Sequence, residues 1–435
     1  MSYRKISKHI FINIFLLAFS ISACNSQNSN NKVAGLPAQE SVIAGPNIPI
    51  ISQFKNKAVV EPHIAVHPGN NNHLLVSAMV VTDSSKPYES CRLSSFVSND
   101  GGLSWKETAH DWWGYDPWVS ILADGKTTMS WIGTKGSFRD EYPVVFFNSP
   151  DGGISWNNDV QMLPGGHDGT KITGSGSNFY FTTVFFGKEM EASIRLYAGD
   201  GMKPFELLTE IDSKGERLNF CEAAVLGDSS IIIPASLWKK NAWVYRYKEG
   251  ILSDAYPITD KLGGGKGYAH LVGDNTASAF KDRLYFIRAA GYGNEYDGIW
   301  LNYSADKGSG WSKDIRVDLF DNPKRSFALV PSVAINKDGV VGVSWVDNQE
   351  PGDKKNDLYF TYSTDGGASF HRPVKVTGKG SSPKTILNND VANKFPGGGH
   401  YLGIAAKPDG SFQLVWSDSR NGVFQLQTCN VALLR

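Results

Sequence analysis

The chain has 435 residues, and its 43 basic and 43 acidic side chains leave it with a net charge near zero. Without a basic run or an excess of positive charge, the sequence lacks the electrostatic footprint of a nucleic-acid-binding protein, and we expect no nucleic-acid partner. Aromatic residues make up 12%, glycine is frequent, and short β-branched and aromatic runs alternate with Gly, Asp, Asn and Pro clusters, which is typical of an all-β chain.

Residues 1–23 are predicted to be a secretory signal. Basic side chains at Arg4, Lys5 and Lys8 precede the apolar run 10–19. This run is shorter than the ~20 apolar residues that a membrane-spanning helix needs. We therefore expect export rather than a membrane span.

Residues 21–24, Ile-Ser-Ala-Cys, resemble the lipobox of bacterial lipoproteins. The resemblance implies cleavage before Cys24, lipidation of Cys24 and a membrane anchor; the alternative is an ordinary signal peptide followed by an unrelated cysteine. Asn25 stands where an inner-membrane retention signal usually has Asp, which favours the outer membrane if the organism is Gram-negative. Residues 24–46 are rich in Ser, Asn, Gln and Gly and predict a flexible tether, so the folded domain is expected at 47–435.

Four segments share the pattern Ser-x-Asp-x-Gly-x-x-Trp/Phe, and Asp200 stands in a decayed fifth copy. The Asp carboxylate and the Ser hydroxyl can accept hydrogen bonds from turn N–H groups, and Gly adopts positive φ without a Cβ penalty. The terminal aromatic side chain has a large apolar area to bury. The aspartates of the four copies are therefore predicted to be structural rather than catalytic: Asp100, Asp151, Asp306 and Asp365.

The serines that open these copies are residues 98, 149, 304 and 363, which fits a repeat of about 50 residues with the longest interval covering three units. Runs that look like inner strands begin near seven positions: Pro62, Pro117, Asp168, Glu222, His270, Pro331 and Tyr401. These repeats predict an all-β β-propeller with seven blades, and six blades as the alternative. The run 48–54 is expected to complete the last blade, because a closed ring leaves no exposed sheet edge.

The four-fold motif resembles the Asp box, or BNR repeat, of the sialidase (neuraminidase) superfamily. The resemblance implies a propeller that handles glycans, and a sialidase-like glycoside hydrolase. Sialidases have six blades, and their first substrate-binding arginine lies in an Arg-Ile-Pro motif at the start of the first inner strand. Here Val60-Glu61-Pro62-His63 stands at that place and Arg-Ile-Pro occurs nowhere. The resemblance therefore covers the scaffold and not the catalytic set.

Residues that directly precede the inner strands of a propeller converge on one central pocket, and here they are rich in imidazoles and carboxylates. General acid–base chemistry is expected from six of them: His63, His167, His270, Asp116, Asp168 and Glu222. Substrate binding, including stacking of aromatic rings on sugars, is expected from six more: Glu61, Trp112, Trp113, Trp118, His400 and Tyr401. The alternative is that the polar groups merely line the channel and the tryptophans pack the core.

No cofactor is predicted with certainty. Imidazole and carboxylate could bind a divalent metal, but the sequence lacks a His-x-x-x-His spacing. Cys91, Cys221 and Cys429 are expected to be buried free thiols, with a Cys91–Cys429 disulfide as the alternative.

The function predicted from these features is that of a lipid-anchored, monomeric enzyme acting on an extracellular glycan. Two alternatives stay open: a polysaccharide lyase that uses the pocket histidines, and a non-catalytic propeller that binds carbohydrate or protein.

Overall fold

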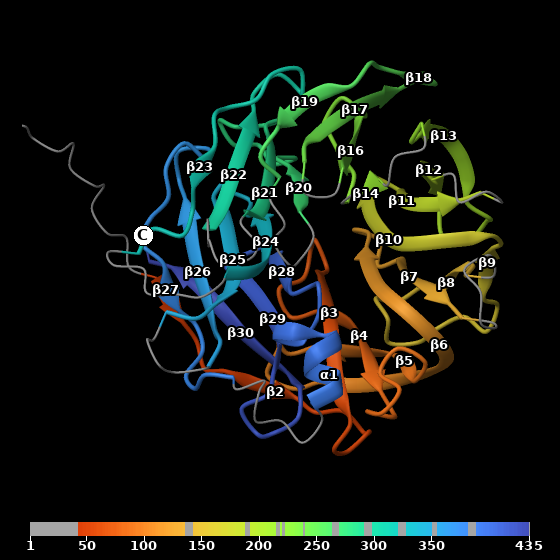
Figure 1. Ribbon diagram of the computed structural model, residues 1–435, viewed down its shortest axis with the longest axis vertical. Helices are drawn as coiled ribbons and strands as arrows, with labels where there is room; N and C mark the ends of the chain where they lie inside the picture. The colour runs from red at the N-terminus through yellow and green to blue at the C-terminus, as the bar shows by residue number, and fades with distance from the viewer. Residues whose placement is uncertain are drawn as a thin grey trace, which may run out of the picture. The chain divides into compact units, whose positions relative to one another are not determined.

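The fold is all-β, and its antiparallel sheets follow one another along the chain (Figure 1). The predicted signal segment, Cys24 and most of the predicted tether lie outside the residues that the structure describes. None of the helices within the described ranges is long and apolar enough to cross a membrane. The computed structural model describes residues 42–134, 142–187, 192–214, 218–219, 222–237, 240–262, 269–290, 298–320, 328–349, 355–381 and 389–434.

The first two repeats share one seven-stranded sheet in chain order. Its strands are β3 (Ala58–Val66), β4 (Leu74–Val81), β5 (Cys91–Ser98), β6 (Lys106–Ile121), β7 (Thr127–Gly133), β8 (Val144–Ser149) and β9 (Gln161–Leu163). The long strand β6 joins the two halves, because its first part pairs with β5 and its second part pairs with β7.

Four further sheets follow. The third repeat contains β10 (Gly166–Ser175), β11 (Asn178–Phe186), β12 (Ala192–Gly199) and β13 (Glu206–Asp212). The fourth contains β14 (Leu218–Asn219), β15 (Ala224–Val225), β16 (Ile231–Leu237), β17 (Ala242–Lys248), β18 (Ile251–Leu252) and β19 (Tyr256–Thr259). The fifth contains β20 (His270–Gly273), β21 (Leu284–Ala290), β22 (Gly298–Ser304) and β23 (Ile315–Arg316). The sixth contains β24 (Ala328–Ile335), β25 (Val341–Asp347), β26 (Asp357–Ser363) and β27 (Val374–Lys375).

The last sheet combines strands from both ends of the described chain. It contains β28 (Gly403–Ala406), β29 (Phe412–Asp418), β30 (Gln425–Leu433), β1 (Val42–Ala44) and β2 (Ile48–Ile50). Both β1 and β2 pair with β30, which confirms closure by an N-terminal strand. The predicted tether is too long at its C-terminal end, since 42–44 form a strand along the free edge of β30. A short helix α1 (Asn389–Lys394) and a 3-10 turn (Pro396–Gly398) precede β28.

The innermost strands make a closed series of contacts. In order they are β3, β6, β10, β15, β20, β24 and β28, and β28 contacts β3 again. The described chain is therefore a β-propeller, as the repeats predicted. The blade number of seven stays a prediction, because by hydrogen bonding the first two repeats form one sheet.

The hydrophobic core lies between neighbouring sheets. Strand β4 is buried at every position, because each sheet is covered on both faces. Successive residues of a strand point to opposite faces: Leu75 packs toward Trp131 of the second repeat, while Val76 packs toward Val415 of the last sheet. The buried, unpaired Cys91 and Cys429 belong to these layers, which confirms two free thiols and rules out the disulfide between them. Cys221 lies outside the described residues.

The repeated Ser-x-Asp turns connect the third strand of a repeat to the fourth, and their aspartates hold the turn together. Asp100 Oδ1 accepts hydrogen bonds from Ser98 Oγ (2.8 Å) and the Ser104 N–H (2.9 Å), and Ser98 Oγ accepts one from the Gly102 N–H (2.9 Å). The same bonds recur around Asp151, Asp306 and Asp365. This hydrogen bonding agrees with a structural role for these carboxylates.

Candidate active site

The first strands of two neighbouring repeats carry the same backbone distortion. The register shifts between Val60 and His63 in β3 and between Tyr115 and Trp118 in β6. At each bulge an acidic residue precedes proline, and both Glu61 and Asp116 have φ of 55°. Proline normally keeps the preceding residue extended, and a non-glycine residue with positive φ costs on the order of 1–3 kcal/mol. Strain of this kind persists only where the surrounding packing fixes it.

Two more first strands repeat the bulge. In β10 the register shifts between Asp168 and Thr170, with Gly169 at φ 55°, and in β24 a shift follows Leu329, with Val330 at φ 54°. Bulges bend a strand and re-aim its side chains. The four bulges therefore determine which side chains reach the centre of the ring.

An aromatic and cationic cluster surrounds Trp118. The His63 ring stacks on it at 3.7 Å between centroids, and the His270 ring lies nearly parallel to it at 6.1 Å. Lys171 Nζ lies 3.8 Å from the Trp118 ring centroid and 3.4 Å from that of Tyr401. The Trp118 side chain is consequently only 1% exposed, so its faces are covered by protein. The sequence prediction named four of these five residues and missed Lys171.

An acidic group lies beside this cluster. Tyr401 donates a hydrogen bond from its hydroxyl to Asp116 Oδ1 at 3.2 Å. The buried Glu61 carboxylate accepts a hydrogen bond from the His400 backbone N–H at 3.2 Å and lies 3.2 Å from His400 Nδ1. A Cβ on Gly399 would lie 2.2 Å from Glu61 Cγ, so only glycine permits this close approach. The structure thus brings together four predicted residues from the first, second and last repeats.

Two carboxyl groups of the site have a pKa raised toward neutral pH. Burial raises the pKa of Asp116 to about 7, the charge of Glu61 adds to this, and the charge of Lys171 opposes it. Burial likewise raises the pKa of Glu222 to about 7, against a 2.5 Å hydrogen bond from Thr173 Oγ1 and the charge of Lys171. Groups with a pKa near the working pH can both donate and accept a proton.

The histidines of the cluster are neutral at pH 7. Burial, followed by the charge of Lys171, lowers the pKa of His270 to about 3, and burial holds the pKa of His63 well below its usual value. Burial also disfavours the charge of His400, but the hydrogen bond to Glu61 and the charges of Glu61 and Asp116 outweigh it and raise its pKa. Proton transfer near neutral pH therefore falls to the carboxyl groups rather than to the two central imidazoles.

His167 does not join the cluster. Its Nε2 lies 3.3 Å from the Pro164 carbonyl oxygen and its Nδ1 lies 3.4 Å from Thr183 Oγ1, while its ring packs edge-on against Phe185. Across the described ranges, its hydrogen bonds and ring contacts include none to His63, Trp118 or His270. Asp168 is exposed, and its influence on the site is a charge effect that raises the pKa of Asp116.

The other two candidate tryptophans lie away from the cluster. Trp112 packs edge-on against Phe147 in the core between the first two repeats. Trp113 is 40% exposed, and the Arg92 guanidinium lies 5.4 Å from its ring centroid. Both residues lie in the first part of β6, which is an outer strand of the first repeat. They therefore do not wall the central site together with Trp118.

Three arginines of the described ranges are held by ion pairs with nearby carboxylates. Arg288 is buried and bonds to Asn302 Oδ1 at 2.6 Å and Asp314 Oδ1 at 2.9 Å. Arg92 and Arg195 pair with Asp111 and Glu210. Among the described residues, no group of three or more His, Cys, Asp or Glu side chains is placed to hold a metal ion.

No family model matches the chain, and no curated protein matches it. Among solved structures, the phage phi92 endosialidase matches with a TM-score of 0.50 and 9% identity, over 90% of this chain and 69% of that chain. The GH93 α-L-arabinofuranosidase of Fusarium graminearum with arabinobiose matches with a TM-score of 0.49 and 12% identity, over 90% and 98%. The Hadza microbial sialidase Hz136 matches with a TM-score of 0.45 and 10% identity, over 91% and 95%. The chain has an all-β propeller fold, and these structural neighbours are glycosidases that share little of its sequence.

Proposed function

We propose that the protein is a carbohydrate-active enzyme that cleaves a glycosidic bond of an extracellular glycan, with Asp116 as its principal proton-transferring group. The observation that carries this proposal is the environment of that carboxyl group. It sits on a strained bulge, accepts a hydrogen bond from Tyr401 and has a pKa near 7. An acid that keeps its proton at neutral pH can protonate a leaving glycosidic oxygen.

Glu222 supplies a second carboxyl group of similar pKa. Most glycosidases use a pair of carboxyl groups, one as acid and one as base or nucleophile. Lys171 acts on both, because its charge lowers the pKa of Asp116 and of Glu222. It thereby keeps the ionised forms accessible, so that each group can complete a cycle of donating and accepting a proton.

The proposal extends to the location of the enzyme. The basic and apolar segment 1–23 and the lipobox-like sequence at Cys24 support export and lipid anchoring at the cell envelope, at the outer membrane in a Gram-negative cell. Glycans outside the cell would then be within reach of the site.

The test is product release by the full-length, detergent-solubilised protein on sialylated, uronate-containing and neutral glycans, with new reducing ends and unsaturated products measured separately, with and without a chelator. We expect new reducing ends on at least one glycan class. Asp116→Asn should lower the rate by at least a hundred-fold, whereas Asp111→Asn, at an exposed carboxylate paired with Arg92, should not. Equal rates in both variants would refute the role of Asp116.

A non-catalytic binding propeller is the second candidate, and one observation favours it. The indole of Trp118, at the centre of the cluster, is almost fully covered by neighbouring side chains. Complete absence of products over the whole panel would support this candidate. Unsaturated products in place of plain reducing ends would instead support a uronate lyase.

A further inference from the structure

Four large apolar side chains protrude in or directly after corresponding turns of four successive repeats. The turns connect β5 to β6, β8 to β9, β12 to β13 and β17 to β18. Their exposed apolar residues are Leu103 (68%), Ile154 (46%), Met202 (61%) and Ile251 (73%). The corresponding turns of the fifth and sixth repeats carry Ser309 and Ala368 instead. The apolar tips therefore form an arc along one side of the ring rather than a full circle.

Contacts between turns hold these tips on one face of the propeller. Within the first repeat, the Gly101 N–H donates to the Asn72 carbonyl oxygen at 3.0 Å. Between repeats, turn-to-turn contacts join His73 Nε2 to the Gly152 carbonyl oxygen (2.8 Å), Lys307 Nζ to Asp228 Oδ2 (2.8 Å), Arg283 Nη1 to the Gly366 carbonyl oxygen (2.7 Å) and the Asp409 N–H to Asn71 Oδ1 (2.8 Å). We call this surface the turn face. The bulges at Glu61 and Asp116 lie nearer the opposite ends of the inner strands, so the candidate active site is displaced from the turn face.

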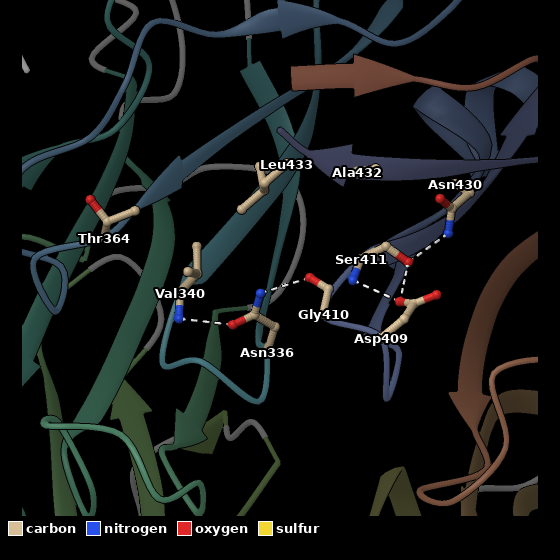
Figure 2. Close-up of a pocket in the computed structure, with 9 residues that line it drawn as sticks. All are labelled: Asn336, Val340, Thr364, Asp409, Gly410, Ser411, Asn430, Ala432 and Leu433. Carbon is tan, nitrogen blue, oxygen red and sulfur yellow. Dashed lines mark hydrogen bonds between the residues drawn. The ribbon is translucent and has the colours of Figure 1, made fainter. Parts of the chain in front are cut away.

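The described chain begins at the same face. Figure 2 shows Leu433, at the end of β30, near the turn residues Asn336, Gly410 and Asp409. Val42 pairs with Leu433, so the first described residue lies at the turn face. The predicted lipidation site, Cys24, is 18 residues earlier (42 − 24). At ~3.6 Å per residue at most, the lipid can be no farther than about 65 Å from this face.

The hollow in Figure 2 is itself a poor ligand site. It has a cavity volume of about 440 Å³, but its polar groups are engaged with one another. Asn336 Nδ2 donates to the Gly410 carbonyl oxygen at 2.7 Å, Ser411 Oγ donates to Asp409 Oδ1 at 2.6 Å, and Asn430 Nδ2 donates to Ser411 Oγ at 2.9 Å. The apolar arc, in contrast, consists of side chains that are exposed to solvent: Leu103, Ile154, Met202 and Ile251.

The charges around the arc do not indicate an electrostatic partner. Lys248 and Lys307 both pair with Asp228, and the carboxylates of Asp100 and Asp151 bond to their own turns. A lipid interface binds exposed apolar side chains without requiring opposite charge. The turn face is also the face at which the described chain begins, 18 residues (42 − 24) after the predicted lipidation site.

We propose that the turn face rests on a lipid membrane, with Leu103, Ile154, Met202 and Ile251 inserted into its interfacial layer and the candidate active site directed away from it. The inference rests on the expected lipidation only for bringing the protein to the membrane, and not on the proposed enzymatic activity. Because the arc covers only one side of the ring, the propeller axis would be tilted with respect to the membrane.

The test uses the full chain with Cys24→Ser, so that no lipid can hold it to phosphatidylcholine vesicles. We expect weak, salt-independent partitioning that falls roughly ten-fold or more in Leu103→Ser/Ile154→Ser/Met202→Ser/Ile251→Ser, since each tip loses its apolar burial. The matched control is Ile51→Ser: Ile51 is 75% exposed, close to the 73% of Ile251, but follows β2 at the opposite face. This control should partition like its parent.

Hydrogen exchange supplies a second readout that needs no tip substitution. On vesicles, amides of residues 101–105, 152–156, 201–203 and 249–252 should gain protection, while those of 307–311 should not. Equal partitioning of the four-fold variant and its parent, or protection confined to the opposite face, would overturn the proposal. Protection of the tips that depends on protein concentration and not on vesicles would also overturn it, in favour of a second copy of the chain. Glycan cleavage is measured separately, so its failure leaves this test intact.

Discussion

His63 stacks on Trp118 with 3.7 Å between their ring centroids, although the two residues lie in the first strands of different repeats. Each directly follows an acidic residue with positive φ and a proline. The repeated bulge thus serves two purposes, since it brings two rings into contact and sets the carboxyl groups of Glu61 and Asp116 beside them. The site depends on backbone strain in neighbouring repeats, and its properties should respond to substitutions that leave the outer strands unchanged.

The two buried histidines His270 and His167 should behave differently on substitution. His270→Ala removes a ring from the cluster around Trp118 and should lower turnover at least ten-fold. His167→Ala removes a side chain that contacts Pro164, Thr183 and Phe185, so it should lower the free energy of unfolding by about 1–3 kcal/mol and leave turnover per folded molecule unchanged. Rate assays paired with denaturant titrations separate the two effects, and a turnover loss in both variants would contradict this assignment.

Lys171→Met should move the pH dependence of turnover. The Lys171 charge lowers the pKa of Asp116 and of Glu222, so its removal raises both. If the protonated carboxyl is the active form, the loss of activity at high pH should shift upward by roughly one pH unit or more. The matched control is Lys126→Met, at an exposed lysine that pairs with Asp124. A downward shift, or equal profiles for the two variants, would exclude this electrostatic role.

Asp151→Ala should destabilise the fold without affecting chemistry. Its carboxylate accepts hydrogen bonds from Ser149 Oγ (2.8 Å), the Ser155 N–H (2.8 Å) and Ser155 Oγ (2.6 Å). Their loss should cost about 1–3 kcal/mol of unfolding free energy. Asp124→Ala breaks an exposed ion pair with Lys126 and one exposed hydrogen bond from the Lys126 N–H (3.1 Å), and should change stability by less than about 1 kcal/mol. Chemical denaturation of both variants measures the difference, and a catalytic defect in folded Asp151→Ala would speak against a structural role.

Stability should rise from about pH 4.5 to about pH 6.5. Four histidines within the described ranges have a folded pKa below their unfolded value, so acid protonates them only in the unfolded chain and lowers stability: His63, His110, His167 and His270. The raised carboxyl groups Asp116 and Glu222 act in the opposite sense, because their stabilising protonated form is lost as pH rises toward 7. Among the described carboxyl groups, only these two have a pKa raised toward neutrality.

Each of these groups changes the free energy of unfolding by up to ~1.4 kcal/mol per pH unit. The four histidines therefore outweigh the two carboxyl groups, and stability rises with pH. Denaturation midpoints measured at steps across this range provide the check. In His167→Asn the slope should become shallower. A midpoint that falls from pH 4.5 to pH 6.5 would show that the carboxyl groups dominate instead.

The sequence predicted the repeat architecture well because its signals are local. The Ser-x-Asp-x-Gly turns lie between third and fourth strands, and the runs near Pro62, Pro117 and His270 do belong to first strands. Export and the anchor at Cys24 stay predictions, since they concern residues outside the described ranges.

The content of the site was harder to predict, and the bulge in β10 explains why. His167 and Lys171 are four residues apart, so a regular strand would place both on the same face. The register shift between Asp168 and Thr170 reverses the alternation, with His167 facing Phe185 and Lys171 facing Trp118. The sequence gives a glycine at 169 but does not indicate that the register shifts there. Trp112 and Trp113 were misplaced for a similar reason, because one unbroken strand, β6, serves two repeats.

The pairing of β1 and β2 with β30 has a consequence for how the molecule is made. Strands β1 and β2 cannot pair until β30, the last strand of the described chain, has been synthesised. Joining segments so distant along the chain carries a large loop-closure cost until the intervening sheets have formed and drawn the two ends together. Completion of the final sheet therefore belongs at the end of folding, and until then the edge of β30 is open to strands of other molecules.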